Sequence, residues 1–155
     1  MTLRSAIAAG IAAGHLAAGP AVAQVIDARD PDALLGVIVA DGYSAQLSQD
    51  SVGDPLIVID DIGIGPTQLY FFGCSDGADC DVVVFTSAYA AADAPSATFV
   101  NGWNRDKLLG RAYVDAEGDP ILEYGVNLHG GVTPQNWSDS VDWWRVMVEA
   151  FEDAL

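Results

Sequence analysis

The sequence predicts an α+β domain, an antiparallel sheet of about six strands with helices on one face, in the order α-β-β-β-β-α-β-β-α. Short apolar runs recur between glycine-containing turns, as in antiparallel sheets. The phrase D-x-x-G-D-P followed by two aliphatic residues occurs twice, at 50–57 and 115–122, and both copies read as hairpin turns. The C-terminal segment instead repeats its apolar residues at helical spacing. Strands and helices that alternate in blocks are typical of the α+β class.

The first half of the domain is expected to hold one helix and four strands. Asp30 and Pro31 form a helix start, in which the carboxylate caps free amides and proline occupies a position that needs no donor. Gly42 is expected to end that helix. The strands are expected at residues 43–49, 56–62, 68–73 and 82–89.

The second half is expected to hold two helices and two strands. Ser96 caps the first helix, whose inward residues are predicted to be Phe99, Val100, Trp103 and Leu108. Strands follow at 111–115 and 121–127. Thr133 and Pro134 then start the last helix, which is expected to reach the C-terminus.

Residues 1–23 have the pattern of a secretory signal peptide. Arg4 gives a positive start, residues 7–18 are apolar, and Ala21-Val22-Ala23 matches an A-x-A cleavage site. An apolar helix retained in the fold is the alternative. We therefore expect cleavage after Ala23, a single domain at 24–155, and a periplasmic or secreted protein that is not inserted in the membrane after signal removal.

The two cysteines, Cys74 and Cys80, flank a turn between two apolar runs. In an oxidising compartment they are expected to form a disulfide across the hairpin. A redox motif would have C-x-x-C spacing. A zinc site would need more ligands, and the mature chain offers only His129.

The chain is strongly acidic, with 22 acidic and 6 basic residues and a formal net charge of −16. Such a charge argues against binding to nucleic acid or to anionic membranes. It fits a soluble exported protein, a cationic partner or a divalent cation.

The motif search favours a protein that is not an enzyme, with no catalytic residue, cofactor or metal. His129 precedes a double glycine, as in the oxyanion loop of esterases, but the chain lacks the G-x-S-x-G nucleophile motif. Asp115, Glu117 and Asp119 have calcium-loop spacing, but the glycine is misplaced. A module that binds a small ligand or divalent cation through these acidic turns remains the alternative function.

The last helix carries two apolar strips. The first is expected to face the core and comprises Trp137, Val141, Trp144, Val148, Phe151 and Leu155. The second comprises Trp143, Met147, Ala150 and Ala154. Either the sheet curls around the helix and buries both strips, or the second strip meets a partner or a second copy. Trp143 and Met147 are therefore candidate partner-binding residues.

Several short motifs resemble the YbjN family over about residues 30–155. They contain Asn101, Trp103, Asn104, then Gly110, Arg111, Tyr113 and Asp115, and then Gly118, Asp119 and Pro120. The paired glycines at 130–131, the cysteines and the tryptophan-rich helix also match its exported members. The family is described as candidate regulators of bacterial sensory transduction. The resemblance implies a fold like that of type III secretion chaperones, which commonly dimerise and hold other polypeptides. It also implies a regulatory or chaperone-like role with no catalytic residue and no cofactor.

Overall fold

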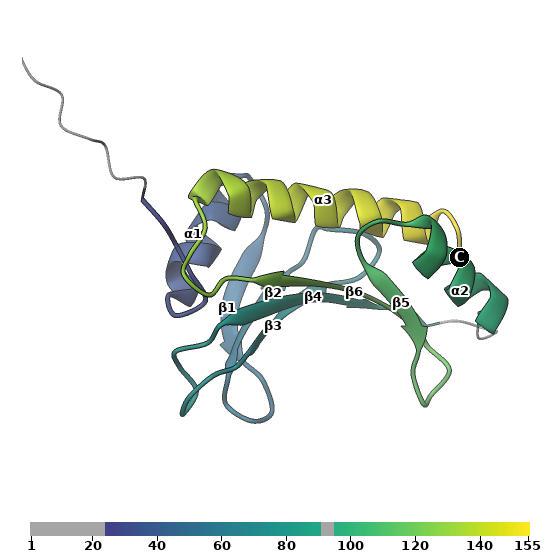
Figure 1. Cartoon of the computed structure of the whole chain (residues 1–155), viewed down its shortest axis with the longest axis horizontal. Coiled ribbons are helices and arrows are strands. Elements are labelled where there is room, and N and C mark those ends of the chain that lie inside the picture. The colour runs from purple at the N-terminus through teal and green to yellow at the C-terminus, as the bar shows by residue number, and fades with distance from the viewer. Residues whose placement is uncertain (1–23, 91–94) are drawn as a thin grey trace, which may run out of the picture.

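The elements follow one another in the predicted order in the computed structural model, which describes residues 24–90 and 95–155 (Figure 1). The predicted signal peptide lies outside the described residues. The elements are α1 (Pro31–Ala40), β1 (Ala45–Gln49), β2 (Pro55–Ile59), β3 (Thr67–Phe72), β4 (Val82–Ala88), α2 (Ala97–Asp106), β5 (Arg111–Val114), β6 (Pro120–Asn127) and α3 (Pro134–Glu152). Within the described ranges, none of the helices has the length and apolar character of a membrane span.

The strands form one antiparallel sheet in the order β1-β2-β3-β4-β6-β5. Helix α3 lies across one face of this sheet, with α1 towards the β1 end and α2 towards the β5 end (Figure 1). The predicted α+β class is therefore confirmed.

The repeated D-x-x-G-D-P phrase forms the same turn twice. In the first copy, Asp50 Oδ1 accepts hydrogen bonds from the amides of Val52, Gly53 and Asp54 at 2.9–3.0 Å. In the second, Asp115 Oδ1 accepts from the amides of Glu117 and Asp119 at 3.0 and 2.8 Å. Both glycines, Gly53 and Gly118, have a φ of 96°, which glycine adopts at little cost.

The predicted helix caps are in place. Asp30, Ser96 and Thr133 each accept a hydrogen bond from the amide three residues later. Gly42, with a φ of 99°, follows the end of α1, where the amide of Tyr43 returns to the carbonyl of Ile38 at 3.3 Å.

The predicted ends of α2 and α3 are wrong, since α3 stops at Glu152 before the C-terminus. Helix α2 ends at Asp106 because Lys107 is already extended, with φ −104° and ψ 131°. Leu108 therefore lies outside the helix and is 97% exposed instead of facing the core.

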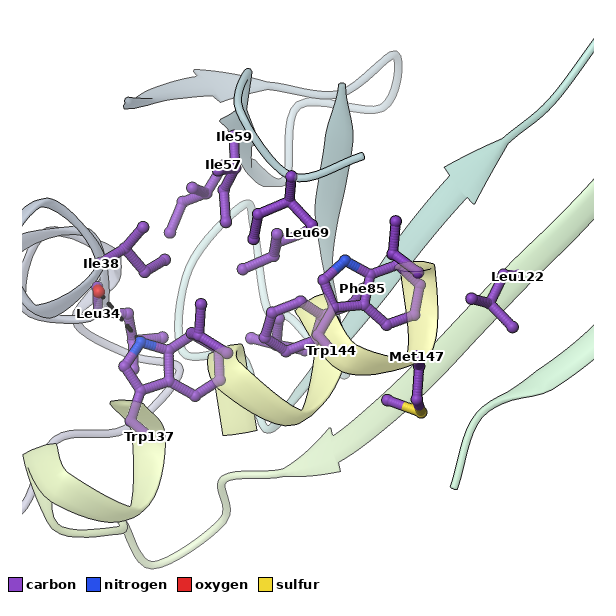
Figure 2. Packing of buried hydrophobic residues seen from close by; sticks show 14 of the residues in the cluster. Leu34, Ile38, Ile57, Ile59, Leu69, Phe85, Leu122, Trp137, Trp144 and Met147 are labelled. Carbon is purple, nitrogen blue, oxygen red and sulfur yellow. Dashed lines mark hydrogen bonds between the residues drawn. The ribbon is translucent and has the colours of Figure 1, made fainter. Parts of the chain in front are cut away.

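The core fills the space between α3 and the sheet (Figure 2). The prediction for the first strip of α3 is confirmed for the residues from Trp137 to Phe151, all of which are buried, but is wrong for Leu155, which is 52% exposed because the helix ends at Glu152. Both indoles of this strip have polar partners: Trp137 donates to the carbonyl of Leu34 at 3.1 Å, and Trp144 donates to Thr67 Oγ1 at 2.9 Å.

The predicted disulfide joins the adjoining ends of β3 and β4. Cys74 and Cys80 are bonded, with their Cα atoms 3.9 Å apart, and Cys80 is buried in the core cluster. The segment between the two cysteines forms a tight turn, in which Asp76 and Asp79 have φ values of 52° and 51°. The disulfide thus closes the hairpin at its tip.

Candidate functional site

An apolar groove runs beside α3, between that helix and the segment that links α2 to β5. Its volume is about 290 Å³. Apart from Lys107, every side chain that lines it is apolar: Trp103, Leu108, Leu109, Trp143, Val146, Met147 and Ala150. Surface concavities of this kind, rich in aromatic and aliphatic side chains, are typical of binding sites.

The two residues that the sequence predicts for partner binding both line the groove but differ in exposure. Trp143 is 49% exposed and lies at the rim, next to Val146 at 40% and Leu108 at 97%. Met147 is only 7% exposed. Met147 therefore belongs to the inner wall of the groove. Of the two alternatives, burial applies to Met147, whereas contact with a partner stays a prediction for Trp143 and for Met147 within the groove.

Met147 is buried because the chain passes close to it at Gly110. Gly110 has a φ of 73°, and a Cβ added there would come within 2.8 Å of Met147 Sδ. Glycine satisfies both the backbone conformation and the close approach. The α2–β5 segment can therefore press against α3 and form the inner wall of the groove.

Trp103 forms the other wall and stacks edge-on against Phe151, with the ring centroids 4.8 Å apart. Its indole nitrogen is buried and has no hydrogen-bond partner among the described residues. The ammonium of Lys107 lies 5.0 Å from the centre of the Trp103 ring, a cation–π distance. The groove thus has an aromatic wall with one cation over it.

The residues that resemble the family motif hold this wall on the sheet. Asn104 makes two hydrogen bonds to the backbone of Ala112: its side-chain nitrogen donates to the carbonyl at 3.0 Å, and its oxygen accepts from the amide at 2.8 Å. This pair ties α2 to β5. Asn101 is exposed on α2. Asp115, Gly118, Asp119 and Pro120 shape the following hairpin.

Glu123, on β6, forms hydrogen bonds with two further motif residues on β5. Its Oε2 accepts from Arg111 Nη2 at 2.6 Å, and its Oε1 accepts from the Tyr113 hydroxyl at 2.9 Å. Burial, followed by the hydrogen bond to Glu123, raises the pKa of Tyr113 above its ordinary value. The motif therefore maintains the β5–β6 pairing and brings no reactive group together.

His129 lies away from the groove, at the end of the sheet near the disulfide. Its Nδ1 is 2.8 Å from Asp81 Oδ1, and the two side chains are 77% and 47% exposed. Among the residues that the structure describes, no serine or cysteine hydrogen-bonds to this imidazole, and no group of three His, Cys, Asp or Glu side chains is arranged to hold a metal. The structure thus forms a solvated histidine–carboxylate pair at this position.

Sequence reasoning missed three groove residues: Lys107, Leu109 and Val146. Val146 follows Trp143 by three positions and so shares its helix face, which the spacing alone would have shown. Lys107 and Leu109 carry no such signal, because their position depends on where the chain leaves α2.

Comparison with known proteins confirms the resemblance to the YbjN family. The profile of the YbjN family, described as "Putative bacterial sensory transduction regulator", matches residues 30–155. Among curated proteins, none matches the chain. A solved structure, "Crystal structure of YbjN, a putative transcription regulator from E. coli", is similar with a TM-score of 0.58 and 14% sequence identity, and covers 79% of this chain and 91% of that one. At this identity the likeness concerns the fold. Because the profile covers the entire domain, the chain belongs to the YbjN family.

Proposed function

We propose that this chain is an exported regulatory domain that acts by binding another polypeptide and performs no catalysis. The observation that carries this proposal is the groove beside α3, in which Trp143, Val146 and Leu108 stay exposed around an apolar interior. The transfer of such apolar side chains from water into an interface with a partner has a favourable free energy.

The groove has the features of an interface anchor. Tryptophan is enriched among the residues that dominate binding energy, and a half-exposed indole offers a large area that loses little rotamer freedom on binding. The walls are fixed before binding, because Asn104 ties α2 to β5 and Met147 packs against Gly110. Because the walls are already ordered, binding costs less conformational entropy than at a site that must form on binding.

The remaining chemistry supports a role in binding over a role in catalysis. His129 is paired with Asp81 at an open surface, where both side chains are exposed and water screens the pair. The Asp50 and Asp115 carboxylates, at the start of each acidic turn, accept hydrogen bonds from amides of their own turns. Ligand or cation binding by these turns stays the alternative prediction.

Export is supported by the pattern of residues 1–23 and by the disulfide. Cysteines pair stably in oxidising compartments such as the periplasm. We expect the protein purified from its own host to begin at Gln24. N-terminal mass analysis checks this, and an N-terminus that retains residues 1–23 would contradict the export proposal.

The binding proposal is tested by substitutions at the rim of the groove. Trp143→Glu and Leu108→Glu place a charge where an apolar contact is expected, and both are expected to fold because the side chains are exposed. Val39→Glu, at a 51% exposed position on α1, is the matched control. In-cell cross-linking followed by mass spectrometry should identify the same partner for wild type and Val39→Glu.

The same partner should be lost from both groove variants, whereas the far-ultraviolet circular dichroism spectrum should stay unchanged. Equal capture by all four proteins would rule out the groove as the contact surface. Sedimentation of the wild type separates self-association from capture of another protein. A homodimer that Trp143→Glu dissociates would make a second copy of this chain the partner.

A further inference from the structure

The face of the sheet opposite α3 carries no helix in the part of the chain that the structure describes (Figure 1). The register and the alternating burial define which side chains point to it. Ile57, Leu69, Phe71 and Phe85 face the core, so their neighbours along each strand face outwards. On the central strands, the large apolar members of this outward set are Leu56, Val58, Tyr70, Phe72, Val82 and Val84.

This composition is unusual for a surface in water. The solvated face of an antiparallel sheet normally alternates to polar residues. Here the outward polar residues of β3 and β4 are Gln68 and Thr86, and Phe72 is 51% exposed. Val58, Tyr70, Val82 and Val84 are half-buried, and Leu56 is only 8% exposed. Contiguous apolar surface that stays accessible to water is typical of a binding face. We call this surface, from β1 to β5 on the side away from α3, the open face.

The open face is also electrically neutral in a chain whose net charge is −16. Among its described strand residues, Arg111 and Glu123 are the only charged side chains, and they form an ion pair with each other at 2.6 Å. The depletion of charge from the centre of a patch rich in aromatic residues is the compositional signature of an interface core.

A hollow of about 470 Å³ lies on this face, bordered by Phe72, Val84, the Arg111–Glu123 pair and Gly125. Gly125 is in the interior of β6, where glycine weakens a strand. Neither its φ nor its surroundings require glycine: φ is not positive, and the nearest atom to an added Cβ would be Val84 Cγ2 at 4.0 Å. The effect of glycine here is to leave the floor of the hollow open, and a strand glycine can mark a place where another group approaches closely.

Acidic turns surround the open face. The β1–β2, β3–β4 and β5–β6 turns project beyond the sheet on the side away from α3 (Figure 1). They carry Asp50, Asp54, Asp76, Asp79, Asp115, Glu117 and Asp119, none of which forms a salt bridge within the described ranges. The surface thus has an apolar centre and a rim of one charge sign.

We propose that the open face is a second docking surface, for a polypeptide segment with an apolar centre flanked by basic side chains. A large apolar side chain of that segment fills the hollow over Gly125, and its lysines or arginines meet the acidic turns. A second copy of this chain does not fit, because in a symmetric contact each acidic rim would face a like-charged rim. This inference goes beyond the groove beside α3, which lies on the other side of the sheet.

The test uses three synthetic peptides of equal length with the isotope-labelled mature protein. One has an aromatic and aliphatic centre flanked by lysines, the second replaces the lysines by glutamates, and the third replaces the apolar centre by glycine and serine. The lysine-flanked apolar peptide is expected to bind, to shift the amide signals of Tyr70, Phe72, Val84 and Gly125, and to weaken with added salt. The other two are expected to bind at least about tenfold more weakly, because each lacks half of the contact.

Two variants test the surface itself. Phe72→Lys should reduce affinity for the lysine-flanked apolar peptide by about tenfold or more. Ile64→Lys, at an 86% exposed apolar position outside the open face, adds the same charge and should leave affinity within about twofold. Gly125→Val should fill the hollow and weaken binding, without loss of fold, because valine suits a strand and the added Cβ has room.

Each other result overturns the proposal in a distinguishable way. Equal binding of the glycine–serine peptide would mean that the acidic turns attract cations without an apolar contact. Signal shifts confined to Trp143 and Val146 would assign the peptide to the groove. A homodimer that Phe72→Lys dissociates would make a second copy the occupant of the open face.

Discussion

Removing the indole of Trp144 should be among the most damaging single changes in this domain. The side chain is fully buried between α3 and the sheet, with the ring of Phe85 at 5.6 Å (Figure 2). Its nitrogen donates to Thr67 Oγ1 at 2.9 Å, and that hydroxyl lies 3.0 Å from Ser87 Oγ. Trp144→Ala therefore creates a large cavity and also breaks a buried polar chain.

The expected cost follows from these contacts. Truncating a buried tryptophan to alanine costs about 3–5 kcal/mol through lost transfer energy and the cavity that remains. Losing the indole donor adds little, because Thr67 and Ser87 keep each other as partners. Domains of this kind are stable by about 5–15 kcal/mol, so the substitution removes about a fifth or more of the free energy of unfolding.

Urea unfolding measures this cost, with Trp143→Ala as the neighbouring control. With a slope of about 2 kcal/mol per molar urea, Trp144→Ala should lower the midpoint by about 2 M. Trp143, half-exposed at the groove rim, should cost less than about 1 kcal/mol. A midpoint for Trp144→Ala as high as that of Trp143→Ala would refute the assignment of the two faces of α3.

Three other outcomes are expected. Mass spectrometry of the protein purified from its own host should find Cys74 and Cys80 bonded, and reduction should lower stability by about 2 kcal/mol without unfolding the sheet; free thiols in that protein would contradict the pairing. Asn104→Ala should cost about 1–3 kcal/mol, measured by urea unfolding, because both backbone groups of Ala112 lose their side-chain partner; an unchanged midpoint would mean that this pair does not hold α2. Burial raises the pKa of the Tyr89 hydroxyl above the value of about 10 that it has in the unfolded chain. The folded protein therefore keeps this proton at a pH where the unfolded chain loses it, so the free energy of unfolding falls as the pH rises above about 10. Tyr89→Phe should flatten this alkaline loss and leave stability at neutral pH intact, since that hydroxyl has no hydrogen-bond partner among the described residues; an equal alkaline loss in the variant would assign the effect to another group.

The elements were predictable because their ends are encoded locally. Asp30, Ser96 and Thr133 cap helices through their own side chains, and the first aspartate of each D-x-x-G-D-P phrase closes its own turn. These signals act over a few residues and need no tertiary context. The end of α2 is different: no glycine marks it, and the chain leaves the helix where the sheet edge requires β5 to begin. Leu108 was misplaced for that reason.

The groove and the open face were not predictable to the same degree. Helical spacing identified Trp143, but the opposite wall comes from the α2–β5 segment, whose contact with α3 joins parts of the chain far apart in sequence. The apolar run in β4 does not reveal whether both of its faces are covered, because a strand buried on both sides has the same appearance. Only the arrangement of the helices shows that one face stays open.

Gly110 links the two proposed surfaces physically. One side of it meets Met147 Sδ, which lines the groove, and the other borders the hollow on the open face. Gly110 and Met147 thus lie between the two cavities, and a side chain at position 110 would displace Met147 from the wall of the groove. Trp143 and Phe72 each contact only one of the two cavities and are both exposed. Substitutions at these two positions, and not at the glycine between them, are what can assign a binding partner to one side of the sheet or the other.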